Sequence, residues 1–433
     1  MDTSKGFYSG LINNISMISK SILAQVIKDQ KEEFNNLTGT VKRDEFKEVI
    51  SYSGASALIL KGLRRCGKST LLKQLIDKKF RDNFFYFNFD EERIINFKTE
   101  DFQKLMETFM ELYGDKKTIF FDEIQNITGW ELFINRLLRQ GYHIFITGSN
   151  SNLLSKELGT HLTGRHVDLE LFPFSFAEYL RAKQIEPKNK YYSTKENALY
   201  SKYFKQYLKE GGLPEKVVFN NNSILTQVLT DITQKDIVNR YNLRKPAEFR
   251  AILNFLLSNT ANTITYRSIK NNFNIKSITT IQKYIQYAEE TYITFQVHRF
   301  ERKIKLINKN PKKIYCIDNG IVSHNTPSTK EQEGNLLENV IAVQLKRNGK
   351  EFYYYQKDNS EADFVVPKEK TVLQVCYNLN ETNKEREFKG LKKAMEEMKT
   401  NKGTIITLDQ ENIIKEKGKT IEIIPAWKWL LEK

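Results

Sequence analysis

The stretch ALILKGLRRCGKSTLLKQL, from Ala57 to Leu75, decides the fold of the first half of this 433-residue chain. Its first four residues predict a short buried strand, and the run that begins at Ser69 has the spacing of an amphipathic helix. Between them, Gly62 to Ser69 fits the pattern G-x-x-x-x-G-K-S/T of a phosphate-binding loop. Because the loop requires this strand-loop-helix context, we favour it over a structural turn that contains glycine.

The residue types in this loop suit a nucleotide and a magnesium ion. Backbone N–H groups of a glycine-rich loop converge on phosphate oxygens, and the start of the helix adds a partial positive charge. We expect Lys68 to reach the β- and γ-phosphates of ATP, and the Ser69 hydroxyl to coordinate Mg²⁺. Arg64 and Arg65 either screen phosphate or are simply solvated. The predicted nucleotide-binding residues of the loop are Gly62, Leu63, Arg64, Arg65, Cys66, Gly67, Lys68, Ser69 and Thr70.

A second acidic feature follows the loop. The segment TIFFDEIQ places Asp122 and Glu123 at the end of an apolar strand, 54 residues after Lys68. Open parallel sheets bind their ligands at the carboxyl ends of the strands. We therefore expect Asp122 to hold Mg²⁺ through its water shell and Glu123 to activate the attacking water. A solvated strand end is the alternative, and the presence of the loop favours the catalytic interpretation.

Two further segments offer contacts to the nucleotide. The strand HIFIT is followed by Ser149 and Asn150, and one of these residues or Thr147 is a candidate sensor of the γ-phosphate. A helix cap in a strand-to-loop turn is the alternative. Arg165 precedes the strand HVDLEL and is a candidate arginine finger, acting on its own or a neighbouring subunit, or an ordinary surface arginine.

The rest of the first half predicts an α/β fold. Short apolar runs at ALIL, FFYFNF, TIFF, HIFIT and HVDLEL alternate with helical segments, which indicates a mainly parallel sheet covered on both faces. We predict an N-terminal helical segment over 1–50, an ATPase core over 51–172, a helical lid over 173–245, a winged helix over 246–322 and a further α/β domain over 331–433.

Composition narrows the class of protein. The chain has 68 Lys+Arg and 53 Asp+Glu, a net charge of +15, which favours a polyanionic partner or reflects a general solubility bias of a Lys-rich proteome. No apolar stretch has the length of a membrane span, and no secretion signal is recognisable, so we expect a cytoplasmic protein without a membrane partner. The three cysteines are too few and too far apart for a disulfide framework or a zinc site.

Several motifs in one order carry a family resemblance. The segments KGLRRCGKSTLL, FDEIQNITGWE, ITGSNSNLL, LTGRHVDLELFPFSFAEYL and GGLPE resemble a family of bacterial and archaeal AAA+ superfamily ATPases. The resemblance implies an AAA+-like sheet, a winged helix and a restriction-endonuclease-like domain, and it places Arg165 at a recurrent G-R position. The resemblance therefore implies which domains the chain contains but does not identify its biological role.

A basic segment follows the three helices expected between residues 247 and 290. Two strand-like runs are expected after them, joined by a turn at Asn308 to Lys313. The segment from Arg299 to Lys313 holds seven basic residues and one acid, which is the density that phosphate contacts need. We predict that nucleic-acid phosphates are contacted by Lys303, Lys305, Lys312 and Lys313. Docking of a protein partner is the alternative.

The resemblance also implies a damaged nuclease site near the C-terminus. Glu338, Asp363 and Gln374 match the acidic helix residue, the strand Asp and the Q-x-K strand of such nucleases. Cys376 stands where the lysine is expected. Since that lysine orients water and stabilises charge in the transition state, we expect no cleavage.

These observations lead to one favoured function and two alternatives. We expect an ATP-hydrolysing protein that couples nucleotide state to nucleic-acid binding, with DNA favoured over RNA. A homo-oligomer is a candidate assembly, since Arg165 is a candidate finger for a neighbouring subunit. The first alternative is an ATP-gated switch that docks a partner protein. The second is an ATP-dependent nuclease.

Overall fold

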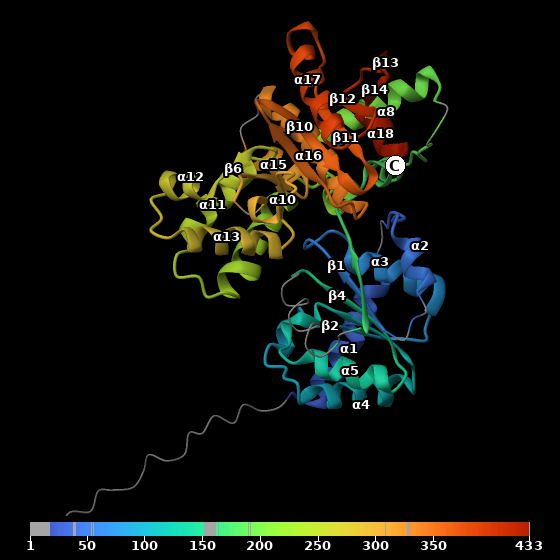
Figure 1. The fold of residues 1–433 in the computed structure, drawn as a ribbon. Coiled ribbons are helices and arrows are strands. Elements are labelled where there is room, and N and C mark those ends of the chain that lie inside the picture. The colour runs from blue at the N-terminus through green and yellow to red at the C-terminus, as the bar shows by residue number, and fades with distance from the viewer. Residues whose placement is uncertain are drawn as a thin grey trace, which may run out of the picture.

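The computed structural model describes residues 18–37, 40–52, 54, 56–150, 162, 164–188, 190, 192–307, 309–326 and 330–432. Figure 1 shows three regions, namely an N-terminal lobe in blue and cyan, a three-helix module in yellow, and a C-terminal lobe in orange and red. The green helix α8 (Thr194–Glu210) lies beside the C-terminal lobe, next to α18 (Ala426–Glu432).

A five-stranded parallel sheet forms the centre of the N-terminal lobe. Its strands are β1 (Ala57–Lys61), β2 (Phe85–Asn88), β3 (Thr118–Asp122), β4 (His143–Gly148) and β5 (His166–Glu170). Their order is β2-β3-β4-β1-β5, and every pair is parallel. The predicted α/β fold with a parallel sheet is confirmed. Strand β4 lies between β3, which ends in Asp122, and β1, which leads into the glycine-rich loop.

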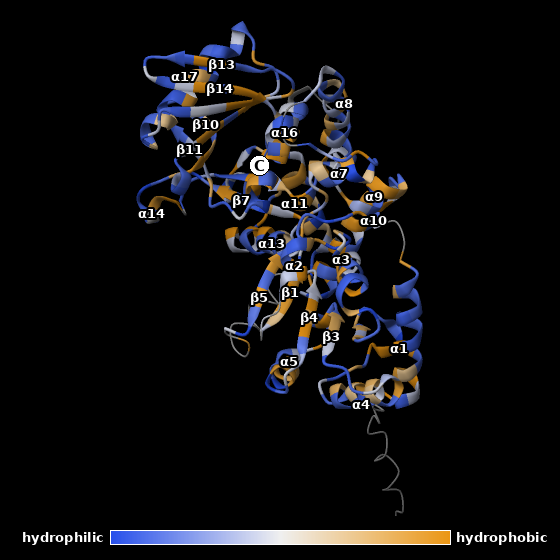
Figure 2. Ribbon diagram, turned by 90° about the vertical axis from the view of Figure 1, so that its right-hand side faces the viewer, coloured by the Kyte–Doolittle hydropathy of each residue, from blue (hydrophilic) through white to orange (hydrophobic). Residues whose placement is uncertain are grey.

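Alternate residues of each strand enter two separate cores. Leu58, Phe120 and Phe145 face one core, while Ile59 and Phe121 face the other. Figure 2 shows the apolar character of β1, β3 and β4 between more polar helices. Helices cover both faces because both faces of a parallel sheet are apolar. The helical elements of this lobe are α1 (Lys20–Asn35), α2 (Phe46–Ser51), α3 (Lys68–Leu75), η1 (Ile76–Phe80), η2 (Glu92–Ile94), α4 (Asp101–Tyr113), η3 (Ile124–Asn126) and α5 (Trp130–Arg139).

The lid is helical, as the sequence predicts. Its elements are α7 (Phe176–Ala182), α8 (Thr194–Glu210), α9 (Pro214–Phe219), α10 (Ser223–Asp231) and η4 (Ile232–Asn239). Capping boxes at Ser175 and Ser193 begin α7 and α8. The short helix α9 begins at Pro214, shortly after the Gly211-Gly212 pair that follows α8.

The three-helix module combines α11 (Pro246–Ser258), α12 (Tyr266–Asn272) and α13 (Ile278–Glu290) with a small antiparallel sheet. The sheet has the order β6 (Thr263–Ile264), β8 (Lys312–Cys316), β7 (Thr294–His298). Lys312 pairs with His298 and Lys313 with Val297, so the predicted turn at 308–313 ends earlier than expected, at the start of β8. Two short helices, α14 (Ile304–Ile307) and α15 (Asn319–Asn325), flank β8.

A six-stranded mixed sheet organises the C-terminal lobe. The strands are β9 (Tyr353–Lys357), β10 (Ser360–Val366), β11 (Thr371–Cys376), β12 (Lys402–Thr407), β13 (Asn412–Glu416) and β14 (Lys419–Pro425), in the order β13-β14-β12-β11-β10-β9. The accompanying helices are α16 (Lys330–Arg347), η5 (Pro367–Glu369), α17 (Glu381–Glu397) and α18 (Ala426–Glu432). Elements β13, β14 and α18 were not predicted. Phe300 N–H donates to Tyr354 O at 2.7 Å and joins the three-helix module to the edge of this sheet.

In the part of the chain that the structure describes, none of the helices combines the length and apolar character needed to span a bilayer. The cysteines Cys66, Cys316 and Cys376 are all buried and free.

Candidate functional site

The glycine-rich loop connects β1 to α3 in a conformation that only glycine adopts easily. Gly62 has φ 151° and Gly67 has φ 99°. A Cβ atom on Gly62 would lie 2.1 Å from the carbonyl oxygen of Leu171, which follows β5. The first glycine of the motif is therefore required both by backbone conformation and by the neighbouring chain.

The predicted lysine, serine and two acids converge at the end of the sheet. Ser69 Oγ donates to Asp122 Oδ2 at 2.5 Å. Lys68 Nζ donates to the carbonyl oxygens of Gly62 and Leu63, each at 3.2 Å, and lies 3.6 Å from Glu123 Oε1. The sequence motifs thus meet in space as the strand order requires.

The two neighbouring acids have opposite electrostatic surroundings. Burial and the adjacent Glu123 raise the pKa of Asp122, against the hydrogen bond from Ser69. Burial acts to raise the pKa of Glu123 as well, but Lys68 and Arg64 outweigh it and lower this pKa. Glu123 is therefore held as a carboxylate. Its φ of 54° is unusual for a residue with a side chain, a kind of strain that clusters at functional sites.

Side chains from β4 and β2 orient these two carboxylates. Thr147 donates to Asp122 and accepts from the backbone N–H of Glu123 at 3.2 Å. Ser149 Oγ donates to Glu123 Oε2 at 2.9 Å, and Asn150 is buried beside it in the chain. Tyr86 donates to Asp122 Oδ2 at 3.2 Å. The sequence prediction missed Tyr86, although a hydroxyl within the apolar run FFYFNF was a usable signal.

The two loop arginines contact the lid. Arg64 Nε lies 3.1 Å from Asp236 Oδ2 of η4, and Arg64 Nη1 lies 3.2 Å from Asp90. Arg65 lies 3.2 Å from Glu215 of α9 and 3.4 Å from Asp231 of α10. From the sequence, Arg64 and Arg65 are expected either to screen phosphate or to be solvated. The structure instead pairs both arginines with acids, and these ion pairs hold the lid over the loop.

An open cleft of about 520 Å³ lies in front of the loop. Its polar floor contains Lys68, Ser69, Asp122 and Glu123. Its remaining wall is largely apolar and comes from the segment before β1 and from the lid, with contributions from Leu37, Val41, Phe174, Pro214, Val218 and Phe219. Sequence motifs gave no indication of this wall, because it joins residues more than 170 positions apart.

Oxygen donors at the loop suit magnesium. A serine hydroxyl and a carboxylate 2.5 Å apart are the ligand types that Mg²⁺ takes beside nucleotide phosphates. Ser69 and Asp122 therefore fit a bound Mg²⁺ without rearrangement of the backbone.

Arg165 lies at the opposite end of the sheet from the glycine-rich loop. The backbone N–H of Ala57, the first residue of β1, donates to Arg165 O at 2.9 Å. Five strand residues, about 16 Å, separate that point from Gly62. The Arg165 guanidinium is exposed and donates to Asn135 Oδ1 at 2.7 Å. In this arrangement Arg165 does not reach the site of its own chain.

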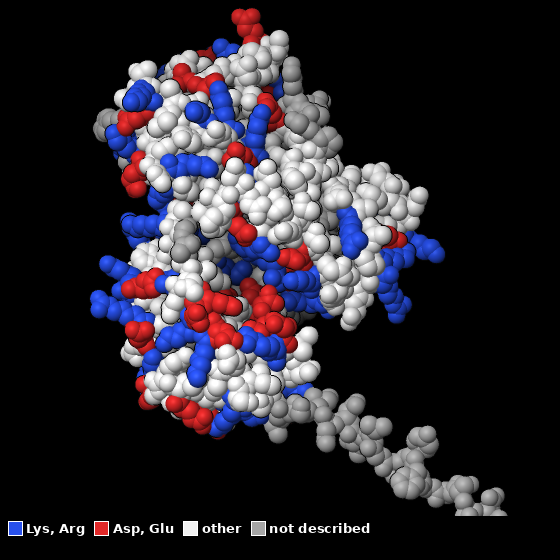
Figure 3. All heavy atoms as spheres, turned by 180° about the vertical axis from the view of Figure 1, so that it is seen from behind, with Lys and Arg blue, Asp and Glu red and all other residues white. Residues whose placement is uncertain are grey.

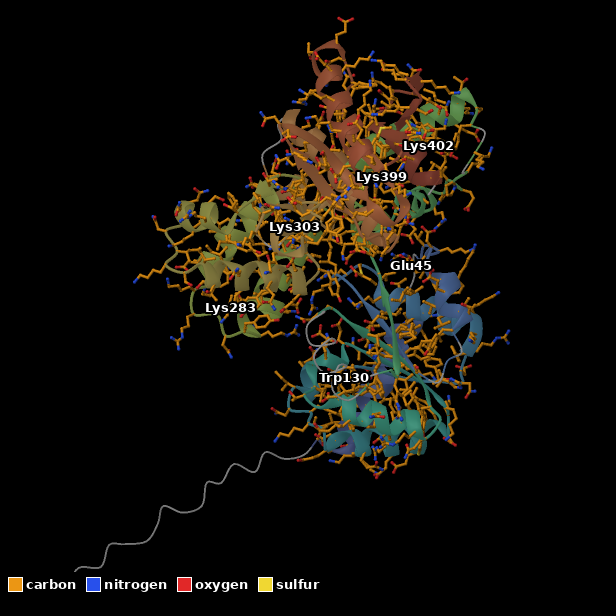
Figure 4. All side chains as sticks on the ribbon, viewed as in Figure 1. Glu45, Trp130, Lys283, Lys303, Lys399 and Lys402 are labelled. Atoms are coloured by element: carbon orange, nitrogen blue, oxygen red, sulfur yellow. The ribbon has the colours of Figure 1, made fainter. Side chains whose placement is uncertain are left out.

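The predicted phosphate-contacting lysines divide into two groups. Lys303 and Lys305 are exposed, and Lys312 is half-buried with its ammonium 2.7 Å from the hydroxyl of Tyr266. Figure 4 shows Lys303 near the junction with the C-terminal lobe and Lys283 toward the other end of the module. Figure 3 shows Lys and Arg spread over this face of the molecule and interspersed with acidic side chains.

Lys313 requires a correction. Its side chain is only 5% exposed and points into the C-terminal lobe, where it contacts three carboxylates. The prediction that Lys313 contacts phosphate on the surface is wrong for this structure, because β8 begins at Lys312 and alternation turns the next side chain inward.

The nuclease-like residues meet in a second cleft. Glu338 on α16, Asp363 on β10 and Gln374 on β11 all line an open cleft of about 1090 Å³. Asp363 Oδ2 accepts from the backbone N–H of Val375 at 2.9 Å, and Gln374 Nε2 donates to Glu387 at 2.7 Å. Burial raises the pKa of Cys376, also in the cleft, to about 11, so its thiol is neutral. The described part of the chain contains no group of three or more His, Cys, Asp or Glu side chains suited to a metal ion.

These features and a family match define the class of protein. Residues 55–180 match a family described as an AAA domain. The chain therefore contains an AAA-type P-loop NTPase domain, which agrees with the predicted ATP-binding core.

Relatives then identify the family. An uncharacterized protein of Methanocaldococcus jannaschii is 36% identical, with 96% of this chain and 97% of that protein covered. An uncharacterized protein of Haemophilus influenzae is 30% identical, with coverage of 80% and 89%. The chain belongs to the family of these prokaryotic AAA-domain proteins. In this chain the AAA domain is followed by two domains of unknown function, DUF8612 over residues 201–332 and DUF4143 over residues 333–429.

Among solved structures, AMPPCP-bound DnaA from Aquifex aeolicus overlaps 61% of this chain and 88% of its own chain at 16% identity. Its TM-score of 0.24 is too low to support an argument about function.

Proposed function

We propose that this protein hydrolyses ATP with Mg²⁺ and uses its nucleotide state to control nucleic-acid binding by the three-helix module and the C-terminal lobe. The observation that carries the first half of the proposal is the convergence of Lys68, Ser69, Asp122 and Glu123 on one cleft. The second half rests on a buried network that joins the loop to the C-terminal lobe, described below.

The site residues divide the chemistry of hydrolysis. Glu123, held ionised by Lys68 and Arg64, accepts the proton of the attacking water as the bond to the γ-phosphorus forms. The leaving group is ADP, whose charge Lys68 stabilises after it exchanges its two carbonyl partners for phosphate oxygens. Mg²⁺ at Ser69 and Asp122 would neutralise phosphate charge. Thr147 and Ser149 keep the two carboxylates in position.

The apolar wall of the cleft suits the base of ATP. Phe219 is 63% exposed although it is a large aromatic residue on the cleft. A planar purine placed between the lid and Val41 would cover its ring. The ion pairs of Arg64 and Arg65 with the lid lie between this wall and the phosphates. ATP binding would therefore change these ion pairs and the apolar wall together.

Arg165 supports a homo-oligomeric form of the enzyme. Since it lies about 16 Å from the loop of its own chain, an arginine-finger role requires a second subunit. The exposed guanidinium at the start of the edge strand β5 is available to such a neighbour.

A buried ionic network supports coupling to the C-terminal lobe. Arg43 Nη1 donates to the loop carbonyl of Cys66 at 2.8 Å, and Arg43 Nε donates to Glu178 at 2.8 Å. Arg347, at the end of α16, lies 3.7 Å from the other oxygen of Glu178 and 3.2 Å from Glu45. Figure 4 shows Glu45 at the junction of the two lobes.

Helix α16 extends this connection to the second cleft. Glu338 precedes Arg347 by nine residues on the same helix, about 14 Å along its axis. A shift of the loop carbonyl on nucleotide binding would therefore act on α16 through side chains that are 0–10% exposed and closely paired.

Nucleic acid is the favoured partner because the exposed lysines Lys303 and Lys305 have no ion-pair partner among the described residues. They lie beside Lys309, which is also exposed, at the edge of the three-helix module. Contacts of this type neutralise phosphates without distinguishing sequences. We favour DNA over RNA on the winged-helix resemblance, and a docked partner protein remains the second candidate.

ATP turnover with and without double-stranded DNA, single-stranded DNA and RNA tests the proposal, together with the mass of the protein with and without bound nucleotide. We expect Mg²⁺-dependent turnover, stimulation of several-fold by DNA, and a mass increase to an oligomer with ATP. Turnover that is indifferent to every nucleic acid, with one defined protein co-purifying, would support the protein-docking switch instead. Absence of turnover under all conditions would refute the ATPase.

Arg347→Met tests the coupling separately. It should retain basal turnover and lose most of the stimulation by DNA, because the guanidinium contacts neither the cleft nor the loop. The double variant with Glu45→Gln restores charge balance at the junction. If the double variant also loses its stimulation by DNA, the cause is loss of the connection and not an unpaired buried carboxylate. Unchanged stimulation in both variants would exclude this path.

A further inference from the structure

The C-terminal cleft contains a lysine that belongs to another part of the chain. Lys313 extends from β8 of the three-helix module into the space between α16 and β10. Its Nζ lies 3.0 Å from Glu338 Oε1, 2.8 Å from Glu361 Oε1 and 2.9 Å from Asp363 Oδ1. The neighbouring Lys312 contacts Tyr266 instead and takes no part in this cluster.

The oxygens around Lys313 are held by the surrounding fold. Tyr315, two residues further along β8, donates to Glu338 Oε1 at 2.6 Å. Asp363 is fixed by the backbone N–H of Val375. Helix α17 packs so closely on β10 that a Cβ atom at Gly390 would lie 1.9 Å from Glu361 O. The fold therefore fixes the carboxylates of Glu338 and Asp363 and the backbone that carries the more exposed Glu361.

Gln374 lines the same cleft and is 7% exposed. Its Nε2 donates to the carboxylate of Glu387, which fixes which end of the amide is the oxygen. The oxygen, Oε1, has no hydrogen-bond partner in the structure, so Lys313 does not hydrogen-bond to it.

We propose that the ammonium group of Lys313 is the resident cation of the C-terminal cleft and takes the place that a divalent metal ion would need. The residues of the nuclease-like motif therefore do not fit a metal ion in the native chain. Contacts of 2.8–3.0 Å match an ammonium hydrogen-bonded to carboxylates, whereas Mg²⁺ and Ca²⁺ require oxygens at about 2.0–2.6 Å.

In the rival role, Lys313 would replace the missing lysine at Cys376. A lysine ammonium has three N–H donors. Two of them donate to Glu338 and Asp363, and Glu361 Oε1 lies 2.8 Å from Nζ, so the ammonium is directed at carboxylates and not at a water molecule or a phosphate. The carboxylates Glu338 and Asp363 raise its pKa well above the ordinary value although burial acts to lower it, so the charge persists.

The consequence is a cleft without the metal ion that nucleic-acid cleavage would need, and a fixed junction between the three-helix module and the C-terminal sheet. This inference does not depend on the proposed function.

Binding of Mn²⁺ without nucleotide tests the proposal, measured by the electron paramagnetic resonance of free Mn²⁺. The variant Lys313→Gln/Glu361→Gln removes one ammonium and one carboxylate, so the net charge of the cluster does not change. We expect about one additional Mn²⁺ per chain with a Kd on the order of 0.1–1 mM, the range of weak carboxylate sites. Adding Asp363→Asn should abolish it. Lys312→Gln is the matched control and should bind no additional ion.

The native chain supplies a second measurement that does not depend on any variant of Lys313. Native protein and Asp363→Asn should bind equal amounts of Mn²⁺. Native binding that disappears in Asp363→Asn would overturn the proposal, because the metal would then occupy the site beside Lys313. The proposal would also be overturned if the folded double variant gained no ion. ATP turnover does not enter either measurement, so failure of the proposed ATPase leaves this result interpretable.

Discussion

The nucleotide cleft and the C-terminal cleft each place a buried lysine among acids, and they differ in how that lysine is paired. Lys68 and Lys313 are both 5% exposed. Lys68 donates to two backbone carbonyls, and its nearest carboxylate oxygen is 3.6 Å away. Lys313 has carboxylate oxygens at 2.8, 2.9 and 3.0 Å.

The difference separates a lysine that can bind substrate from one that cannot. Neutral carbonyl acceptors form weaker bonds with an ammonium than carboxylates do, and phosphate oxygens readily replace them. If Lys313 moved toward a phosphate, the buried carboxylates Glu338 and Asp363 would lose their cation. A lysine near acids is therefore evidence of catalysis only when its donors are free to leave their partners.

The largest expected effect concerns the nucleotide cleft. Glu123→Gln should bind ATP and lower kcat about 10²–10⁴-fold, because an amide cannot accept the proton of the attacking water. Steady-state turnover and equilibrium binding of a fluorescent ATP analogue would measure the two properties. Glu92→Gln, an exposed acid on η2, is the control. Undiminished turnover in Glu123→Gln would show that this carboxylate is not the base.

The next effect concerns stability and compares the two lysines directly. Lys313→Met should lower the free energy of unfolding by about 3–5 kcal/mol, because it leaves the buried acids Glu338 and Asp363 without a cation. Lys68→Met should cost less, since its two closest partners are backbone carbonyls. Urea unfolding at pH 7 would give both values, with Lys312→Met as the neighbouring control. Equal losses for Lys68 and Lys313 would contradict the distinction.

A pH dependence should appear in the second cleft. Burial and the adjacent Asp363 raise the pKa of Glu338 to about 8, against the effect of Lys313 and Tyr315. The folded chain therefore holds a proton that the unfolded chain releases near pH 4.5, so stability is greatest below that pH and falls as pH rises toward 8.

Between pH 6 and 9 this group should cost about 2 kcal/mol of unfolding free energy. Urea unfolding at the two pH values would measure the cost, and Glu338→Gln should remove most of the difference. An equal pH dependence in the native chain and in Glu338→Gln would contradict the assignment to this carboxyl.

Local sequence patterns were sufficient for the nucleotide cleft because its chemistry lies in contiguous motifs. Strand, loop and helix follow one another from Ala57 to Leu75, and the five parallel strands are confirmed. The strand order then brings Asp122 to Ser69 without further information. What the sequence did not provide was the apolar wall, which depends on how the lid closes over Val41.

The C-terminal cleft could be predicted only in part because its key contact joins two domains. Order along the chain correctly grouped Glu338, Asp363 and Gln374 at one cleft. The count of basic residues from Arg299 to Lys313 predicts one exposed basic surface. Side chains alternate along β8, however, so Lys313 points inward to Asp363 whereas Lys312 contacts Tyr266. Charge counting along a segment cannot separate neighbours on opposite faces of a strand.

The smallest expected effect tests whether the two clefts differ in the ligands that they accept. The nucleotide cleft has Phe219 on its wall, whereas the second cleft is lined mainly by charged and amide side chains. Phe219→Ala should weaken ATP binding about 5-fold, which corresponds to about 1 kcal/mol of lost stacking, and leave kcat nearly unchanged. Isothermal titration would measure affinity, with inorganic triphosphate as a ligand that lacks the base.

Triphosphate affinity should not change in Phe219→Ala, because the ring contacts only the base. The matched control is Ile413→Ala, since Ile413 is 61% exposed on β13 of the other lobe and lines neither cleft. Equal weakening of ATP and triphosphate would mean that Phe219 acts on the lid as a whole. The apolar wall would then be a hinge contact, and the distinction between the two clefts would rest on the pairing of Lys68 and Lys313 alone.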